Sequence, residues 1–264
     1  MIFFNNNNKN AKMNHAKTII SDFVNNLDLF PKSIEDVIER LDKKREKLNV
    51  KMDKLEEGLT YVVDKDGRPC DSDLYNYNQI FDLHFEEQMC ELQIKSLYEM
   101  IILNLHKSIE LTINELLHMF FEKTESKHDF HKTSHLVDFL ENKGIEFGKI
   151  IKNNIFIEIK SVNNCIKHSD DIKDLKKIKE FKGKNSITPE LLRFFYARTK
   201  PFISTFINSL NDFICDSLYN FNGTKIKKIA EDFNNRMDEK HANMLIEELK
   251  NSYKRKRQRE RLPF

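Results

Sequence analysis

The sequence is short of the two residues that most often end helices and build tight turns. Its 264 residues include only 6 Gly and 5 Pro, against average shares of about 7% and 5%. β-Sandwiches, barrels and propellers need a turn roughly every 8–12 residues, so the composition excludes these folds. The expected fold class is all-α, a helical bundle with a long helical or coiled-coil arm.

Closely spaced cysteines and long apolar runs are also missing. The four cysteines, at positions 70, 90, 165 and 215, form no Cys-x-x-Cys motif and do not have the spacing of a disulfide framework. No apolar run approaches the ~20 residues that span a bilayer. Residues 1–17 lack the apolar core of about 7–15 residues found in signal peptides. We therefore expect a cytoplasmic protein with no membrane partner.

The scarcity of glycine excludes several catalytic motifs, because the sequence has no Gly-x-Gly-x-x-Gly, no P-loop and no Gly-x-Ser-x-Gly elbow. One polar segment does gather side chains that suit zinc or iron. Its members are His128, His131 and His135, with Glu125, Asp129 and Asp138. The segment straddles a loop and a helix start, so its spacing predicts no fixed ligand geometry. We assign no metal and no cofactor.

The most regular pattern in the chain is a heptad seam over residues 33–59, in a helix that Pro31 opens and Ser33 caps. Apolar residues recur in steps of four and three, with almost only charged residues between them. The seam consists of Ile34, Ile38, Leu41, Arg45, Leu48, Met52, Leu55 and Leu59. It predicts either an arm that binds a protein partner or self-associates, or an amphipathic helix packed on its own domain.

The remaining pattern predicts four segments. Residues 1–10 form a flexible arm, residues 12–72 the N-terminal helices with the coiled-coil-like arm, residues 73–253 a helical bundle, and residues 254–264 a basic tail. Within them we expect helices at 12–29, 33–59, 73–123, 134–142, 147–168, 189–199, 201–219 and 224–249, and a hairpin or loop at 60–72. The helix at 73–123 contains neither Gly nor Pro.

The numbers of basic and acidic residues are nearly equal, 44 and 42, but the basic residues are unevenly distributed along the chain. The tail is basic, and residues 173–184 are rich in lysine. Both stretches suit a phosphate backbone, so we expect RNA or another polyanion as a partner. The candidate nucleic-acid-binding residues are Lys254, Arg255, Lys256, Arg257, Arg259 and Arg261. The alternative is a solubilising terminus or a basic extension of the last helix.

A polar column on the helix at 147–168 is the strongest candidate for a catalytic site. Lys160, Asn164, Lys167 and His168 follow one another at helical spacing, opposite an apolar stripe. A histidine near a helix C-terminus is favoured as imidazolium. Imidazole can act as acid or base near neutral pH, while lysine stabilises charge on a phosphate. The alternative is a purely structural role, in which Asn164 and His168 form hydrogen bonds with nearby backbone groups.

The segment NNCIKHS at 163–169 resembles helical-bundle proteins of the HEPN type, as well as uncharacterised bacterial helical proteins found near defence loci. The resemblance implies a HEPN-like core at about 92–220. It also implies RNA as the target, in a defence or toxin setting, and a metal-independent ribonuclease site or its inactive relative. Catalytic members of that family pair an Arg with a His four to six residues later, usually at a dimer interface. Here Lys160 stands where the Arg is expected, farther from His168.

Three other polar pairs are weighed against this column. Arg236 and His241 have the spacing of an Arg–His pair and form the alternative catalytic pair, although one such pair is expected by chance. His84 with Glu87, and His106 with Glu110, are spaced as surface charge pairs on a helix.

Two functions remain open from the sequence. One is an RNA-directed module, possibly an endoribonuclease, with His168 as the acid or base. The other is a non-catalytic scaffold that binds a protein through residues 33–59.

Overall fold

The computed structural model describes residues 9–60, 63, 65–68, 71–121, 133–151, 155–168 and 172–260. These residues form helices and turns, and none of them lies in a β-strand, so the all-α expectation is confirmed. The chain divides into two units, Met1–Ser217 and Leu218–Phe264, which are described separately.

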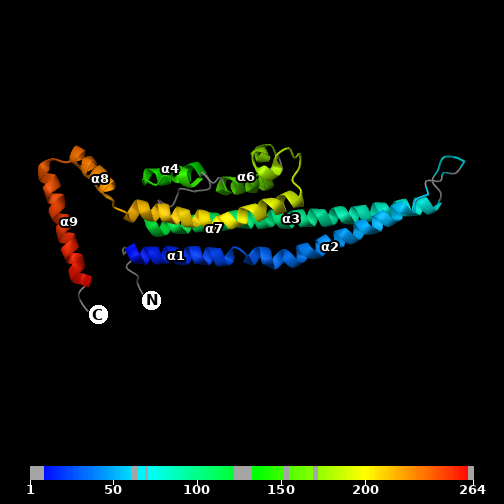
Figure 1. Cartoon of the computed structure of the whole chain (residues 1–264), viewed down its shortest axis with the longest axis horizontal. Coiled ribbons are helices and arrows are strands. Elements are labelled where there is room, and N and C mark those ends of the chain that lie inside the picture. The colour runs from blue at the N-terminus through cyan, green and yellow to red at the C-terminus, as the bar shows by residue number, and fades with distance from the viewer. Residues whose placement is uncertain are drawn as a thin grey trace. The chain divides into compact units, whose positions relative to one another are not determined.

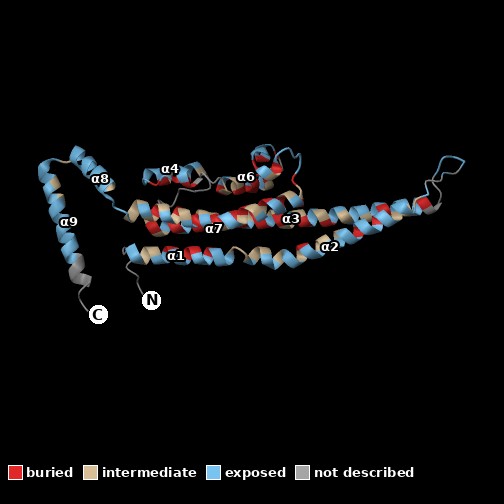
Figure 2. Cartoon of the chain, in the orientation of Figure 1, coloured by how far each residue is buried: buried red, intermediate tan, exposed pale blue. Residues whose placement is uncertain are grey.

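Helix α3 (Asp71–Phe121) is the central element of the first unit. It is 51 residues long and matches the stretch without Gly or Pro. Its C-terminal half is buried on most sides, as its wide apolar arc predicts. The fully covered residues there include Ile102, Leu116 and Leu117. Figure 2 shows the buried residues concentrated in this half and thinning along the arm formed by the other half.

Helices α1 (Lys9–Asn26) and α2 (Leu29–Glu57) run antiparallel to α3, one after the other (Figure 1). Lys12 Nζ of α1 donates to the carbonyl oxygen of Phe120 at 3.3 Å, near the end of α3. Arg45 Nε of α2 donates to Glu87 Oε1 at 2.7 Å, nearer its start. The long helix is thus covered by α1 over its second half and by α2 over its first.

The heptad seam is the face of α2 that packs on α3. Ile38, Leu48 and Met52 are buried, and the other seam residues are half-buried, whereas most residues between them are exposed. The seam therefore packs within its own domain, which is the second of the two interpretations given above. The predicted cap was wrong, because α2 begins at Leu29 and Ser33 Oγ donates to the Phe30 carbonyl from inside the first turns.

Arg45 occupies a seam position because acidic side chains from two helices surround it. Besides the bond to Glu87, its Nη1 donates to Glu190 Oε1 of α7 at 3.0 Å, and its Nη2 lies 3.7 Å from Glu91 Oε2. Its side chain is only about one-quarter exposed. A cation at this depth is held by paired acids rather than by water, and it joins α2, α3 and α7.

The face of α3 opposite α1 is covered by shorter elements. Helix α4 (Thr133–Asn142) is followed by a turn at Gly144, whose φ of 75° favours glycine. There the Ile145 N–H donates to the Leu140 carbonyl at 2.9 Å, as in a Schellman ending. The single helix expected at 147–168 appears as α5 (Phe147–Ile151) and α6 (Ile155–His168), and residues 152–154 lie outside the described part.

The lysine-rich connection after α6 is a pair of 3₁₀-helices, η1 (Ile172–Lys177) and η2 (Lys179–Phe181). Every third residue is buried here, at Ile172, Leu175, Ile178 and Phe181. A 3₁₀-helix has three residues per turn, so this period places all four anchors on one side. The segment is therefore packed against the core.

Helix α7 (Pro189–Tyr219) corrects the expectation of two helices divided at Pro201. Its start is as predicted, since Thr188 Oγ1 accepts from the Leu191 N–H at 3.4 Å. Pro201 lies inside the helix and cannot donate to the Ala197 carbonyl. Both residues are exposed, so water can replace the missing bond. Buried residues continue on either side, including Phe195, Ile203 and Ile207, and this apolar face keeps the helix whole.

The second unit consists of α8 (Gly223–Arg236) and α9 (Glu239–Glu260), where a single helix at 224–249 was expected. Asn222 caps α8 by accepting from the Lys225 N–H at 2.9 Å. Met237 is extended and ends α8. Asp238 then accepts from the His241 N–H at 2.9 Å, so it acts as the N-cap of α9. Helix α9 continues through the basic residues to Glu260, so up to that point the tail is a basic extension of the last helix.

The segment at 60–72 is described only in part. Residues 65–68 form a turn in which Gly67 has a φ of 76°, as the Asp66–Gly67 pair predicts. Thr60 is tied to α3 because Asp73 accepts from both its N–H, at 3.1 Å, and its hydroxyl, at 2.8 Å.

Replacing Arg45 with alanine should lower the free energy of unfolding by about 1–2 kcal/mol, because Glu87, Glu91 and Glu190 would lose their shared cation. Urea unfolding followed by circular dichroism measures the change. The matched control is Arg40→Ala, an exposed position one turn earlier on α2, which should stay within about 0.5 kcal/mol of wild type. Equal effects of the two substitutions would contradict the role given to Arg45.

Candidate functional site

The predicted polar column on α6 does not act as one group. Lys160 is half-buried and its Nζ donates to Thr133 Oγ1 of α4 at 2.8 Å. Burial lowers the pKa of Lys160 from its usual value, and Glu110 acts in the opposite direction. This lysine faces the interior, where it connects α6 to α4.

Asn164, Lys167 and His168 are exposed at the C-terminal end of α6. Lys160 and His168 are eight residues apart, which is about 12 Å along a helix. One phosphate group cannot occupy both positions. Of the column, Asn164, Lys167 and His168 are thus open to a ligand from solvent, and Lys160 is bonded inward.

A buried histidine on α3 faces α6, and the sequence interpretation missed it. His106 is only 4% exposed, and its ring stacks on Phe156 of α6 with centroids 6.3 Å apart. Its Nδ1 lies 3.7 Å from Glu110 Oε2, whose side chain is also mostly covered. The expectation of an exposed His106–Glu110 pair was wrong. The wide apolar arc of α3, with Leu105 and Ile109 next to His106, was the signal that this position is interior.

Burial lowers the pKa of His106 to about 4, so the ring is neutral at pH 7. Glu110 opposes this shift, while Lys167 and Lys160 on α6 and Lys107 on α3 add to it. Glu110 and Lys107 thus act on His106 from its own helix, and Lys160 and Lys167 act on it from α6.

Two buried polar atoms near this contact have no hydrogen-bond partner among the described residues: Nε2 of His106 and Oδ1 of Asn163. Asn163 is only 1% exposed, and its Nδ2 donates to Asn164 Oδ1 at 3.2 Å. Asn163 is therefore the buried asparagine of α6, and Asn164, assigned to the polar column, is exposed. The contact is polar but closed to solvent.

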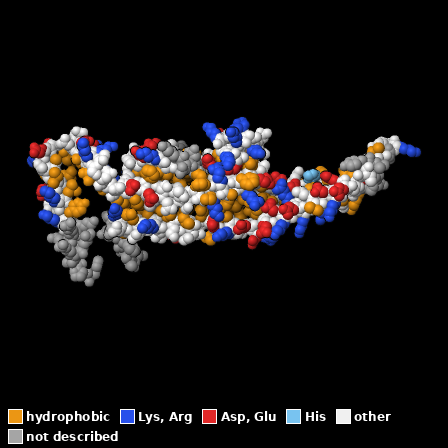
Figure 3. Space-filling model, viewed as in Figure 1, with side chains coloured by type: hydrophobic (Ala, Val, Ile, Leu, Met, Phe, Trp, Pro, Cys, Tyr) orange, Lys and Arg blue, Asp and Glu red, His pale blue; other side chains and the backbone are white. Residues whose placement is uncertain are grey.

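A basic surface lies beyond the end of α6, where Figure 3 shows Lys and Arg side chains gathered above the bundle. The buried anchors of η1 and η2 leave the residues between them exposed. We define the lysine surface as the exposed lysines of this region: Lys167, Lys173, Lys176, Lys177, Lys179, Lys182 and Lys184. Asp174 is the exposed acid among them within residues 172–184.

Arg198 of α7 holds the lysine surface in place and pairs with its other acid, Glu180. Its Nε and Nη2 donate to Glu180 of η2 at 2.5 and 2.8 Å, and Nη2 also donates to Glu158 of α6 at 2.7 Å. Burial opposes ionisation of Glu180, but the bonds from Arg198 outweigh it, and the pKa of Glu180 lies below its usual value. One guanidinium thus pairs with both acids and offsets one of their two negative charges.

The remaining candidates belong to the second unit or lie outside the described residues. Arg236 pairs with Asp232 at 2.9 Å, and His241 Nδ1 pairs with Asp238 at 2.7 Å, so each member of the alternative pair has its own acid. In the tail, Lys254 and Arg255 are exposed on α9, and Arg255 contacts Glu248. Lys256, Arg257 and Arg259 are helical but their side chains are not described, and Arg261 lies outside the described residues.

No metal centre is found in the described part of the chain, where no three His, Cys, Asp or Glu side chains group suitably. His135 is exposed, while His128, His131, Glu125 and Asp129 lie outside that part. No described helix has a stretch long and apolar enough to cross a bilayer.

The expected charge pair of His84 and Glu87 does not form. His84 is exposed, and Glu87 binds Arg45 instead.

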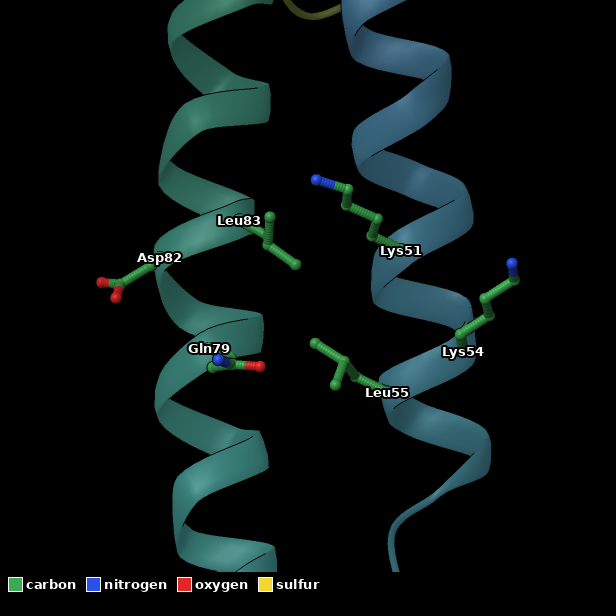
Figure 4. A pocket seen from close by; sticks show the side chains of 6 residues that line it. All are labelled: Lys51, Lys54, Leu55, Gln79, Asp82 and Leu83. Atoms are coloured by element: carbon green, nitrogen blue, oxygen red, sulfur yellow. The ribbon is translucent and has the colours of Figure 1, made fainter.

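A pocket between α2 and α3 in the arm is open and simply lined (Figure 4). Leu55 and Leu83 point into the space between the helices, while Asp82 points away from it. Lys51, Lys54 and Gln79 complete the lining. The gap is an incompletely filled part of the α2–α3 contact, and no buried polar group points into it.

Comparisons of the sequence with family models and curated proteins, and of the structure with solved structures, find no match.

Stability should fall as the pH drops from 7.5 to 5, because an unfolded His106 binds a proton near its usual pKa of about 6.5 while the folded one resists it until about pH 4. This difference amounts to about 2 kcal/mol at pH 5. Urea unfolding at both pH values should show that loss in wild type and a smaller one in His106→Phe, which keeps the ring stack without a titrating group. The exposed-site control His135→Gln should behave as wild type; a loss in His106→Phe as large as in wild type would refute the assignment.

Proposed function

We propose that the protein binds the phosphate backbone of RNA through the lysine surface after α6. The observation that carries the proposal is the three-residue period of η1 and η2. Four buried anchors fix this backbone, so the intervening lysines are held on one surface without ordering a flexible loop. Binding then costs less conformational entropy than it would for a disordered basic segment.

Charge around the lysine surface favours an anionic ligand. Arg198 pairs with Glu158 and Glu180 and offsets one of their two charges, and Asp174 is the exposed acid of residues 172–184, against six exposed lysines there. The exposed Lys167 and His168 extend the surface onto the end of α6. The resemblance of NNCIKHS to HEPN-type proteins makes RNA the expected polymer.

Binding without cleavage is the form of this function that the geometry favours. A metal-independent ribonuclease site needs an acid–base group and a cation directed at the same phosphate. Lys160 is turned inward to Thr133, and about 12 Å of helix separates it from His168. No second histidine accompanies His168 on the described part of this surface.

Fluorescence anisotropy with a labelled single-stranded RNA tests the proposal at several salt concentrations. The variant Lys176→Gln/Lys177→Gln/Lys179→Gln should bind more weakly, and the slope of log K against log salt should become less negative by about two, at ~0.7 for each lost phosphate contact. The matched control, Lys47→Gln/Lys51→Gln/Lys54→Gln, changes three exposed lysines of α2 and should keep the wild-type slope.

Single-stranded DNA of the same sequence serves as competitor and should compete about as well as RNA, because the lysines contact phosphates, which both polymers carry. Equal slopes for the two triple variants would reject the lysine surface. In the same samples, with EDTA present, RNA should remain intact with both wild type and His168→Ala. Cleavage by wild type that His168→Ala abolishes would replace the binding proposal with a ribonuclease site at His168.

A further inference from the structure

The arm carries an apolar stripe on the side of α3 that α2 does not cover. Leu74, Phe81, Phe85 and Leu92 lie along one line of the helix at 3.6 residues per turn, and they are 51%, 73%, 62% and 56% exposed. Tyr77 and Met89 border this line and are about two-fifths exposed. Side chains of this size, grouped over about 27 Å of helix, indicate an interaction surface.

The stripe contains no charge. Between residues 74 and 92, the positions on this face are occupied by Leu, Tyr, Asn, Phe, Phe, Gln, Met and Leu. The rest of the arm surface is rich in Lys, Asp and Glu, with pairs such as Lys44–Glu86 at 3.2 Å. A charge-free face bordered by charged ones matches the core and rim of a protein interface.

The order of residues in the stripe is symmetric about Leu83. Leu74 and Leu92 each lie nine residues from it, Tyr77 and Met89 six, and Phe81 and Phe85 two. In an antiparallel pair of identical helices related by a two-fold axis at this level, each residue faces its mirror position. Leucine then meets leucine and phenylalanine meets phenylalanine, and each such contact occurs twice, as in an isologous interface.

The neighbouring structure also favours the antiparallel arrangement. Glu110 lies 18 residues after Leu92, which is about five helical turns, so His106 and Glu110 continue the same face of α3 into the bundle. There α6 covers it. A parallel partner would run into α6, whereas an antiparallel partner centred on Leu83 would end opposite residue 95, where its own α3 begins.

The available area fits a reversible dimer. An aromatic side chain offers roughly 150–250 Å², so the exposed parts of these six side chains amount to on the order of 500 Å² per copy. Two copies would bury about 1,000 Å², which is at the lower limit for a specific interface.

We propose that the protein forms an antiparallel homodimer through the apolar stripe of α3, with Phe81 of each copy packed against Phe85 of the other. The two arms then form a four-helix bundle in which each α2 lies on the outside. The seam of α2, at residues 33–59, stays in its intramolecular contact with α3.

Sedimentation velocity of the full chain over a range of concentrations tests the dimer. Wild type should shift toward twice its mass of 31.5 kDa, while Phe81→Glu/Phe85→Glu should remain monomeric with unchanged helical content. Phe194→Glu is the matched control, because Phe194 is 63% exposed on α7 away from the stripe, and it should dimerise as wild type. A monomeric wild type, or equal loss in the control, would overturn the proposal.

Cysteine cross-linking tests the direction, in a background with Cys70→Ala and Cys215→Ala. A mixture of two differently tagged variants, Leu74→Cys and Leu92→Cys, should form the mixed disulfide dimer readily. Leu74→Cys alone should not, because the two copies of residue 74 lie at opposite ends of the interface. Efficient cross-linking of Leu74→Cys alone would show a parallel pair and refute the antiparallel arrangement.

Discussion

The length of α3 is the constraint on which the rest of the first unit depends. A helix of 51 residues extends about 77 Å, and no single neighbour is long enough to cover its apolar side chains. The chain meets this need with different neighbours along the helix. Helix α2 packs on its first half, α1 on its second, and α6 covers a further face in the bundle (Figure 1). One face of the first half has no such neighbour among the described residues, and that face is the apolar stripe.

Partly buried ion pairs join these helices. They fix how the helices are aligned along one another, which apolar contacts alone do not determine. Arg45 and Arg198 each bind carboxylates from two other elements, and both lie about one-quarter exposed. A planar guanidinium with five N–H donors can satisfy several acids at once, which a lysine does less well. Arg198 has a second effect, since the two acids with which it pairs border the lysine surface, and its charge offsets one of theirs. The same contact therefore fixes the backbone of η2 and makes the surface above it more positive.

Much of the fold follows from residue spacing, and the errors have identifiable causes. The seam from Ile34 to Leu59 predicts its buried face, because a heptad period depends only on local order. Pro201 was predicted to end a helix, but burial on both sides of it outweighs one lost hydrogen bond. His106 was assigned to the surface from its pairing with Glu110, although its depth is set by α6, more than 40 residues later. The period of η1 and η2 was visible in the sequence, but the abundance of lysine concealed its four anchors.

Helix α3 also links the arm to the bundle mechanically. Between Asp71 and Phe121 there is neither glycine nor proline, and sharp bends in helices usually occur at such residues. The arm therefore has no hinge within α3, and a force applied near its tip reaches the bundle as a torque. Helix α2 packs alongside α3, so the pair is stiffer than one helix. The arm therefore moves with the bundle as one rigid piece.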